Sequence, residues 1–217
     1  MSALSEASKA WYAGFHEAAR ERGLASASFW TARESDPLYF SGSGHVVTKR
    51  NADGSFNTAT YFSAKPWAVD SLLWTTLGGD MGGRRKRTGL RAIGAFAVHG
   101  ERFGFSTGDT RTTAAAQLDE FVAATRKYEA EVPDIPTFIA RVEALRADRP
   151  DVPHMHVLLL TLSLVIDKQV DAAAAIIDER EPIGGNFQVG DVGVWTMLQT
   201  NLRARTGIFD PEYAPVY

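Results

Sequence analysis

The sequence predicts an α+β fold, with an antiparallel sheet in the first half of the chain and helices in the second half. Three observations support this prediction. Apolar residues near the N-terminus recur every three or four positions, as on one face of a helix, at Leu4, Ala7, Trp11, Phe15 and Ala18. Residues 26–106 contain short apolar runs separated by turn residues, and the helical period returns after residue 110. We expect an N-terminal helix, about five to six strands with one inserted helix, and then a helical half.

The N-terminal helix has Ser2 or Ser5 as its expected N-cap, and Gly23 as the residue that ends it. The expected strands cover residues 27–32, 38–41, 44–50, 55–64, 90–99 and 102–106.

Residues that favour turns mark where these expected strands begin and end. Asp36-Pro37 and the segment Asn51-Ala52-Asp53-Gly54 each predict a turn. In the strand after the second turn, Phe56, Thr58, Thr60 and Phe62 share one face by the period of two. Ser41-Gly42-Ser43-Gly44 is expected to be a small flexible turn. Gly100-Glu101 predicts a hairpin in which Val98 faces Phe103 and Phe96 faces Phe105.

The helix inserted in the sheet is expected to begin at Pro66 and to end at Gly78, with an apolar stripe between them. Later helices are expected over residues 112–130, 136–147, 154–167, 169–180 and 191–205. Residues 183–190 form a connection between two of them. The chain is thus expected to consist of a sheet region, residues 1–110, and a helical region, residues 111–217, packed on it as one continuous domain.

Composition excludes several functions. The 217 residues include no cysteine, which removes disulfides, thiol catalysis and cysteine metal sites. A net charge of −3 and a pI near 6.0 argue against bulk binding of nucleic acid. The N-terminus has no basic segment followed by an apolar one. The longest apolar run, Val157 to Ile166, is too short to span a bilayer. We expect a cytoplasmic protein that does not enter a membrane.

The most distinctive segment is the glycine-rich basic loop, Gly78 to Arg87. Its glycines allow a wide range of backbone conformations, and its arginines and lysine form a cluster of positive charge. Guanidinium groups bind phosphate and carboxylate well. The loop lacks the Lys-Ser/Thr pair of a P-loop and follows a helix instead of preceding one. Three interpretations stay open: a solvated connection, docking of an acidic protein or anionic ligand, and, least favoured, binding of nucleic acid.

No catalytic or metal site is predicted. His154 and His156 lie two positions apart, so on a helix their imidazoles diverge. The GxSxG pattern of a serine hydrolase is absent. Most tryptophans lie on apolar stripes and are expected in the core. Trp67, beside Pro66 at a helix start, is the one most expected to be partly exposed.

The outline resembles that of small bacterial α+β proteins classed as domains of unknown function, of the type found in high-GC actinobacteria. The resemblance rests on the order of elements over about the first 150 residues, on the segment Lys65 to Gly78 (KPWAVDSLLWTTLG) and on the Ala-, Arg- and Asp-rich composition. It implies no activity, no cofactor and no catalytic residue.

The sequence therefore favours a binding protein that is not an enzyme, such as an accessory, immunity or antitoxin-like protein. It would dock an acidic partner through the exposed face of the sheet and through Arg84, Arg85, Lys86, Arg87, Arg91 and Trp67. The alternative is an enzyme or small-ligand binder with an anion-binding cleft between sheet and helices. That alternative predicts a pocket of several hundred Å³ with convergent polar groups. In a third alternative the loop is inert, and function lies in a pocket that only the fold reveals.

Overall fold

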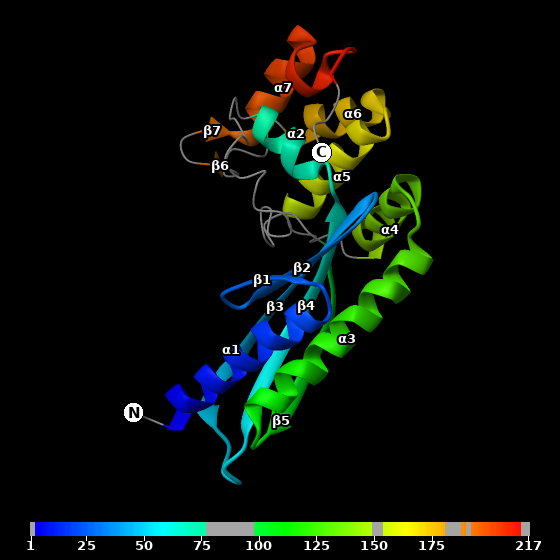
Figure 1. The fold of residues 1–217 in the computed structure, drawn as a ribbon. Coiled ribbons are helices and arrows are strands. Elements are labelled where there is room, and N and C mark those ends of the chain that lie inside the picture. Colours follow the sequence, from blue (N-terminus) through cyan, green and yellow to red (C-terminus); the bar gives the residue numbers. More distant parts are fainter. Residues whose placement is uncertain (1–2, 77–97, 149–153, 181–187, 190–191, 214–217) are drawn as a thin grey trace. The chain divides into compact units, whose positions relative to one another are not determined.

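The computed structural model of the chain describes residues 3–76, 98–148, 154–180, 188–189 and 192–213 (Figure 1). These residues form two compact units. The sheet unit contains residues 3–64 and 98–131, and the helical unit contains residues 65–76 and the described residues from 132 to 213. The basic loop lies outside the described residues. The fold is α+β, as the sequence predicts.

The sheet has five antiparallel strands that lie side by side in chain order. They are β1 (Ala25–Ala27), β2 (Trp30–Ser35), β3 (Leu38–Arg50), β4 (Phe56–Pro66) and β5 (Val98–Thr107). The turn at Asp36-Pro37 is confirmed, because Ser35 pairs with Leu38 across it. The turn at Asn51–Gly54 is confirmed as well. The backbone N–H of Asn51 donates to the carbonyl of Ser55 at 2.8 Å, and Gly54 has the positive φ of +86° that such a turn favours.

Helices α1 (Ala3–Glu21) and α3 (Thr110–Glu131) run in the same direction over one face of this sheet (Figure 1). Aromatic rings fill the space between the layers. Phe62 of β4 lies against Phe40 of β3, with ring centres 5.8 Å apart, and against Phe121 and Tyr128 of α3. Phe56, Thr58, Thr60 and Phe62 are all buried, which confirms their predicted shared face.

The predicted turn at Ser41–Gly44 is wrong, because β3 runs through it without a break. The two glycines serve close packing instead of flexibility. A Cβ added at Gly42 would lie 2.9 Å from Cδ2 of Phe121, and one added at Gly44 would overlap the ring of Trp11. Trp11 is held there by a 2.8 Å hydrogen bond from its Nε1 to Oε1 of Gln117. Glycine is thus needed where two helix aromatics press on the strand.

The predicted hairpin at Gly100-Glu101 is also wrong, because these residues lie inside β5. Phe103 pairs with Thr60 and Phe105 with Thr58, so both phenylalanines take partners on β4 instead of in a hairpin. The register shifts between Tyr61 and Ser63, opposite Gly100-Glu101. The glycine therefore marks a β-bulge and not a turn. The predicted partner Phe96 and the start of that hairpin lie outside the described residues.

The expected strand over residues 27–32 proves to be two strands joined by a tight turn. Ser28 has a φ of +52°, and Ala27 pairs with Trp30 across it. The edge of the sheet is therefore a small hairpin, and β1 is the short edge strand. A short edge strand exposes few unpaired backbone groups to other chains.

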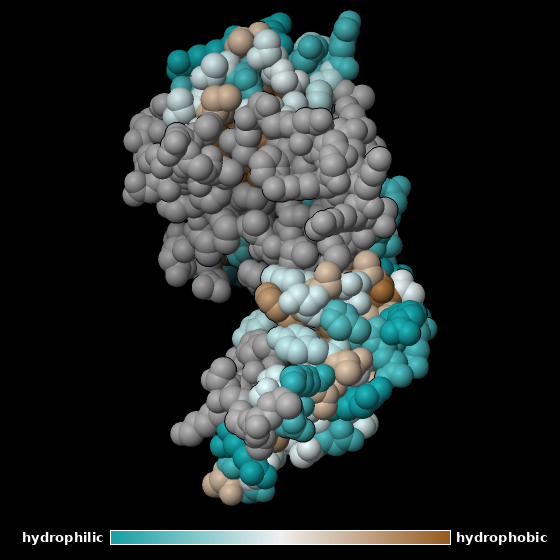
Figure 2. Space-filling view, turned by 60° about the vertical axis from the view of Figure 1, so that its left-hand side comes forward, coloured by the Kyte–Doolittle hydropathy of each residue, from teal (hydrophilic) through white to brown (hydrophobic). Residues whose placement is uncertain are grey.

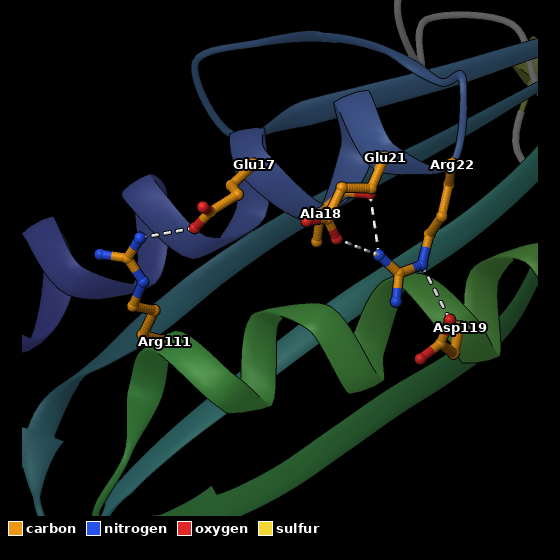
Figure 3. Close-up of polar contacts among 6 residues, drawn as sticks. All are labelled: Glu17, Ala18, Glu21, Arg22, Arg111 and Asp119. Atoms are coloured by element: carbon orange, nitrogen blue, oxygen red, sulfur yellow. Dashed lines mark hydrogen bonds and ion pairs between the residues drawn. The ribbon is translucent and has the colours of Figure 1, made fainter.

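Charged residues join α1 to α3 along their shared seam (Figure 3). The guanidinium of Arg22 donates to Oδ1 of Asp119 at 2.8 Å, and that hydrogen bond raises the pKa of Arg22. Arg111 pairs with Glu17 at 2.5 Å. Close packing accompanies these pairs, because a Cβ added at Gly14 would lie 2.5 Å from the carbonyl oxygen of Arg111. The seam aligns the two helices.

The helical unit contains all the other elements. They are α2 (Val69–Thr76), α4 (Ile135–Asp148), α5 (His154–Ile166), α6 (Val170–Arg180), β6 (Gln188–Val189), β7 (Val192–Gly193), α7 (Val194–Ala204) and the 3-10 helix η1 (Gly207–Phe209). Every residue from Val157 to Leu164 is buried, which confirms the predicted buried helix. The two polar residues of this run are satisfied locally, because Thr161 and Ser163 each donate to the carbonyl four positions earlier.

Candidate functional site

The structure describes only one of the predicted binding residues. Arg84, Arg85, Lys86, Arg87 and Arg91 lie outside the described residues, so docking through them stays a prediction. The predicted helix start at Pro66 is wrong, because Pro66 is the last residue of β4 and α2 begins at Val69. Trp67 lies in the turn between them and is half-buried, so the predicted partial exposure is confirmed. Its role in binding also stays a prediction.

The described residues of the helical unit line a candidate pocket of about 570 Å³. We call it the C-terminal pocket. It lies among the end of α5, the start of α6, the end of α7, η1 and the residues that follow η1. Its apolar walls include Leu72, Val165, Ile166, Leu202, Ile208 and Phe209. Three of these, Leu72, Ile208 and Phe209, belong to the buried core, so the floor of the pocket is part of the folded interior.

The wall at the end of α5 depends on an uncommon backbone conformation. The N–H of Lys168 donates to the carbonyl of Val165, and the N–H of Gln169 donates to the carbonyl of Leu164 at 2.8 Å. This pair of bonds is a Schellman closure, which requires a left-handed residue, usually glycine. Lys168 occupies that position with a φ of +61°. The chain turns there from α5 directly into α6, whose first turn contains Asp171.

The wall at the end of α7 is built in the same way. The N–H of Arg205 donates to the carbonyl of Leu202 and that of Thr206 to the carbonyl of Asn201. Arg205 takes the left-handed position with a φ of +51°. The corresponding closure of α1, in the sheet unit, has Gly23 at this position with a φ of +66°. Two closures that line one pocket therefore carry a cation where the third carries glycine.

Four charged side chains line the pocket, two of each sign. Lys168 and Asp171 belong to the connection from α5 to α6, whereas Arg205 and Asp210 flank η1. All four are exposed, and none forms an ion pair with another residue that the structure describes. Oδ1 of Asp210 accepts the backbone N–H of Glu212 at 2.9 Å, which orients that carboxylate. Charges of both signs are thus available to a ligand.

Polar contacts with α2 fix the segment that follows α7. The hydroxyl of Tyr213, a pocket residue, forms a 3.1 Å hydrogen bond with Oγ1 of Thr75. Asn201 donates to the carbonyl of Thr76 at 3.4 Å. The same segment is tightened by η1, where Gly207 has a φ of +59°. The pocket is therefore bounded by structured elements on the α2, α5, α6 and α7 sides.

A second chemically notable pair is Lys65 and Asp70. Nζ of Lys65 lies 2.7 Å from both carboxylate oxygens, and the side chains are 1% and 0% exposed. A buried charge needs such a partner, because desolvation of a lone charge is costly. The pair joins the end of β4 to the first turn of α2, and its burial leaves no access for a ligand. We interpret it as structural.

Neither a metal site nor a membrane span is found in the part of the chain that the structure describes. No three residues among its histidines and acidic side chains gather closely enough to hold an ion. No described helix has the length and apolar character needed to cross a bilayer. On the face drawn in Figure 2, hydrophobic colour on the described surface is confined to small areas among hydrophilic ones. The described large apolar side chains that are exposed are Phe29, Tyr61 and Val170.

A scan against protein-family models finds no match to this chain, and searches of curated proteins and of solved structures find none either. The resemblance to bacterial domains of unknown function stays a prediction. A functional proposal for this chain must therefore come from its own residues.

Sequence reasoning did not name the residues of the C-terminal pocket. It predicted helices over 154–167 and 169–180, which leaves a single residue between them, and it ended the last helix at about Arg205. A one-residue break without glycine requires some other residue to adopt the left-handed conformation. That spacing was the available signal for Lys168. For Arg205 the signal was weaker, because Gly207 stands close by as a more usual helix stop.

Proposed function

We propose that this chain is a binding protein, and that the C-terminal pocket holds a small ligand with an apolar body. The pocket volume of about 570 Å³ supports the proposal. Small-molecule sites typically enclose about 300–1,000 Å³ and combine apolar walls with a few polar groups. The apolar walls would contact the body of the ligand, and the charged side chains would orient it. The proposal differs from the predicted cleft between sheet and helices, because every residue that lines the pocket belongs to the helical unit.

The observation that carries the proposal is that two of the three described non-glycine residues with a positive φ line one pocket, whereas the third, Ser28, lies in the β1–β2 turn. A residue other than glycine in this conformation costs on the order of 1 kcal/mol. Lys168 and Arg205 both have this conformation, and both line the same pocket. Such outliers cluster at functional sites, where the side chain has a use that offsets the cost.

The proposal is tested with a neutral aromatic probe, N-acetyl-L-phenylalaninamide, titrated into the full chain with labelled methyl groups. At about 0.3 kcal/mol per non-hydrogen atom, a probe of this size binds with a Kd on the order of 1 mM. We expect saturable shifts of the methyl signals of Ile166, Leu202 and Ile208, which line the pocket.

Two matched variants locate the binding. Ala174 lines the pocket and is half-buried, whereas its neighbour Ala175 on α6 is exposed and is not one of the lining residues. Ala174→Phe fills the pocket and should abolish the shifts. Ala175→Phe adds the same ring outside and should leave them. If the probe shifts no pocket methyl, or if both variants bind it equally, the proposed function is wrong.

A further inference from the structure

We infer that the ligand of the C-terminal pocket is a zwitterion with an apolar body, of the class of an apolar amino acid or a short apolar peptide. This inference rests on the proposed function and adds the charge of the ligand to it. It follows from the sign and position of the four charged residues that line the pocket, and from the finding that none of them forms an ion pair with a described residue.

The charges are balanced on each side of the pocket. The α5–α6 connection contributes Lys168 and Asp171, and the segment around η1 contributes Arg205 and Asp210. An anionic ligand would meet two carboxylates, and a cationic ligand would meet an ammonium and a guanidinium. A ligand that carries one charge of each sign can pair with a group of opposite sign at both of its ends. Charge complementarity therefore favours a zwitterion.

These charges are available because the fold does not neutralise them. The described ion pairs lie elsewhere, for example between Arg22 and Asp119 or within the buried pair of Lys65 and Asp70. The guanidinium of Arg205 has N–H donors along the edge of its plane, and two of them can hold a carboxylate by parallel hydrogen bonds. Asp210, oriented by the N–H of Glu212, retains its second oxygen to accept from an ammonium group.

The apolar side chains at the floor of the pocket favour a ligand whose uncharged part is apolar. Leu72, Ile208 and Phe209 are buried aliphatic and aromatic side chains that offer no charge of their own. A polar zwitterion such as glycine would leave this surface in contact with water and would gain little from the pocket. A side chain such as that of leucine or phenylalanine would cover it.

The test compares four forms of one probe with the full chain: L-phenylalanine, N-acetyl-L-phenylalanine, L-phenylalaninamide and N-acetyl-L-phenylalaninamide. They carry both charges, the negative charge, the positive charge and none. Exposed ion pairs strengthen binding only modestly, so we expect L-phenylalanine to bind about fivefold more tightly than the neutral form. Because exposed charges are screened by salt, this preference should disappear in about 1 M NaCl.

Charge-removing variants assign the two ends of the ligand. Arg205→Gln with Lys168→Gln should weaken the zwitterion and the acid, whereas Asp171→Asn with Asp210→Asn should weaken the zwitterion and the amide. Unchanged affinity for the neutral form shows that each variant has kept the pocket. If the acid or the amide binds more tightly than L-phenylalanine, or if all four forms bind equally, the inference is wrong and the proposed function stands. If none binds, the proposed function itself fails.

Discussion

Replacing Lys168 and Arg205 by glycine and by alanine gives the sharpest test of how the C-terminal pocket is built. Both replacements remove the cation, so both lose the same charge interactions. They differ in backbone freedom alone. At a φ of +61° or +51°, alanine keeps the unfavourable left-handed conformation, whereas glycine adopts it readily.

The expected difference follows from two opposing terms. The left-handed conformation costs a residue other than glycine about 1–2 kcal/mol. Glycine loses more backbone freedom on folding than alanine does, which costs about 0.5–1 kcal/mol. Lys168→Gly should therefore be more stable than Lys168→Ala by about 0.5–1 kcal/mol, and the same holds at Arg205. If the two closures act independently, the double glycine variant should exceed the double alanine variant by about 1–2 kcal/mol.

The assay is urea unfolding followed by the methyl signals of Ile208, which report on the helical unit. Gly23→Ala is the reverse control, read from the methyls of Leu118 in the sheet unit. A Cβ added at Gly23 meets no atom within 4 Å, so a loss of stability there measures backbone conformation alone. If the alanine variants prove as stable as the glycine variants, Lys168 and Arg205 bear no conformational cost, and the main support for a functional pocket is removed.

Three further predictions concern the framework. Asp70→Asn should destabilise the protein by about 3–5 kcal/mol, because it removes the carboxylate that lies against the buried ammonium of Lys65, and Lys65→Met in the same chain should restore part of the loss in urea unfolding. Gly44→Ala should cost about 1–3 kcal/mol by overlap with Trp11, whereas Gly104→Ala, whose Cβ would meet its nearest atom at 3.7 Å, should be nearly neutral. At the start of α3, the hydroxyl and N–H of Thr112 hold the pKa of Asp109 below its ordinary 3.8. Its stabilising contribution is therefore present above about pH 4 and is lost as pH falls through the lowered value, so Asp109→Asn should show a smaller drop in urea midpoint on acidification.

Local signals were sufficient for most of the fold. Each predicted helix that falls on described residues is present. The apolar stripe and the capping residue of a helix are both formed by residues close together in the sequence, so local patterns are enough to predict them. Even there, one helix start was missed: α3 begins at Thr110 and is capped by Asp109, whereas the helix was predicted over residues 112–130. The two-residue turn at Asp36-Pro37 and the Asn51–Gly54 turn were likewise predicted from residues adjacent in sequence.

The structural role of a residue could not be predicted where it depends on a residue far away in the sequence. Glycine in a strand permits a turn, a bulge or the close approach of another element, and the sequence does not distinguish these uses. At Gly42 and Gly44 the deciding residues are Phe121 and Trp11, which lie on two different helices. At Gly100 the deciding element is β4, whose residues pair with the whole of β5. Each misassigned turn thus depended on a residue far away in the chain.

The candidate site was beyond sequence reasoning for a different reason. A basic cluster such as Arg84 to Arg87 attracts notice because its charges are adjacent, whereas the four charges of the pocket come from separate helix ends. The fold brings them together at the ends of α5 and α7, where each helix ends in a Schellman closure. No single stretch of sequence contains more than two of them.

Helix α1 ends in the same kind of closure as α5 and α7, but with glycine instead of a cation at the left-handed position. Gly23 forms that closure without the strain of a left-handed side-chain-bearing residue, so glycine was an available solution at α5 and α7 too. Glycine has no side chain, however, and could not place a charge beside the pocket. A cation at a helix C-terminus also interacts favourably with the helix dipole, which offsets part of the cost, about 0.3–1 kcal/mol. A surface lysine one turn earlier in the helix would gain that interaction without the strain. The dipole therefore explains why these residues are basic, but it leaves unexplained why they stand at the left-handed position, and the proposed binding of a ligand carboxylate would supply that reason.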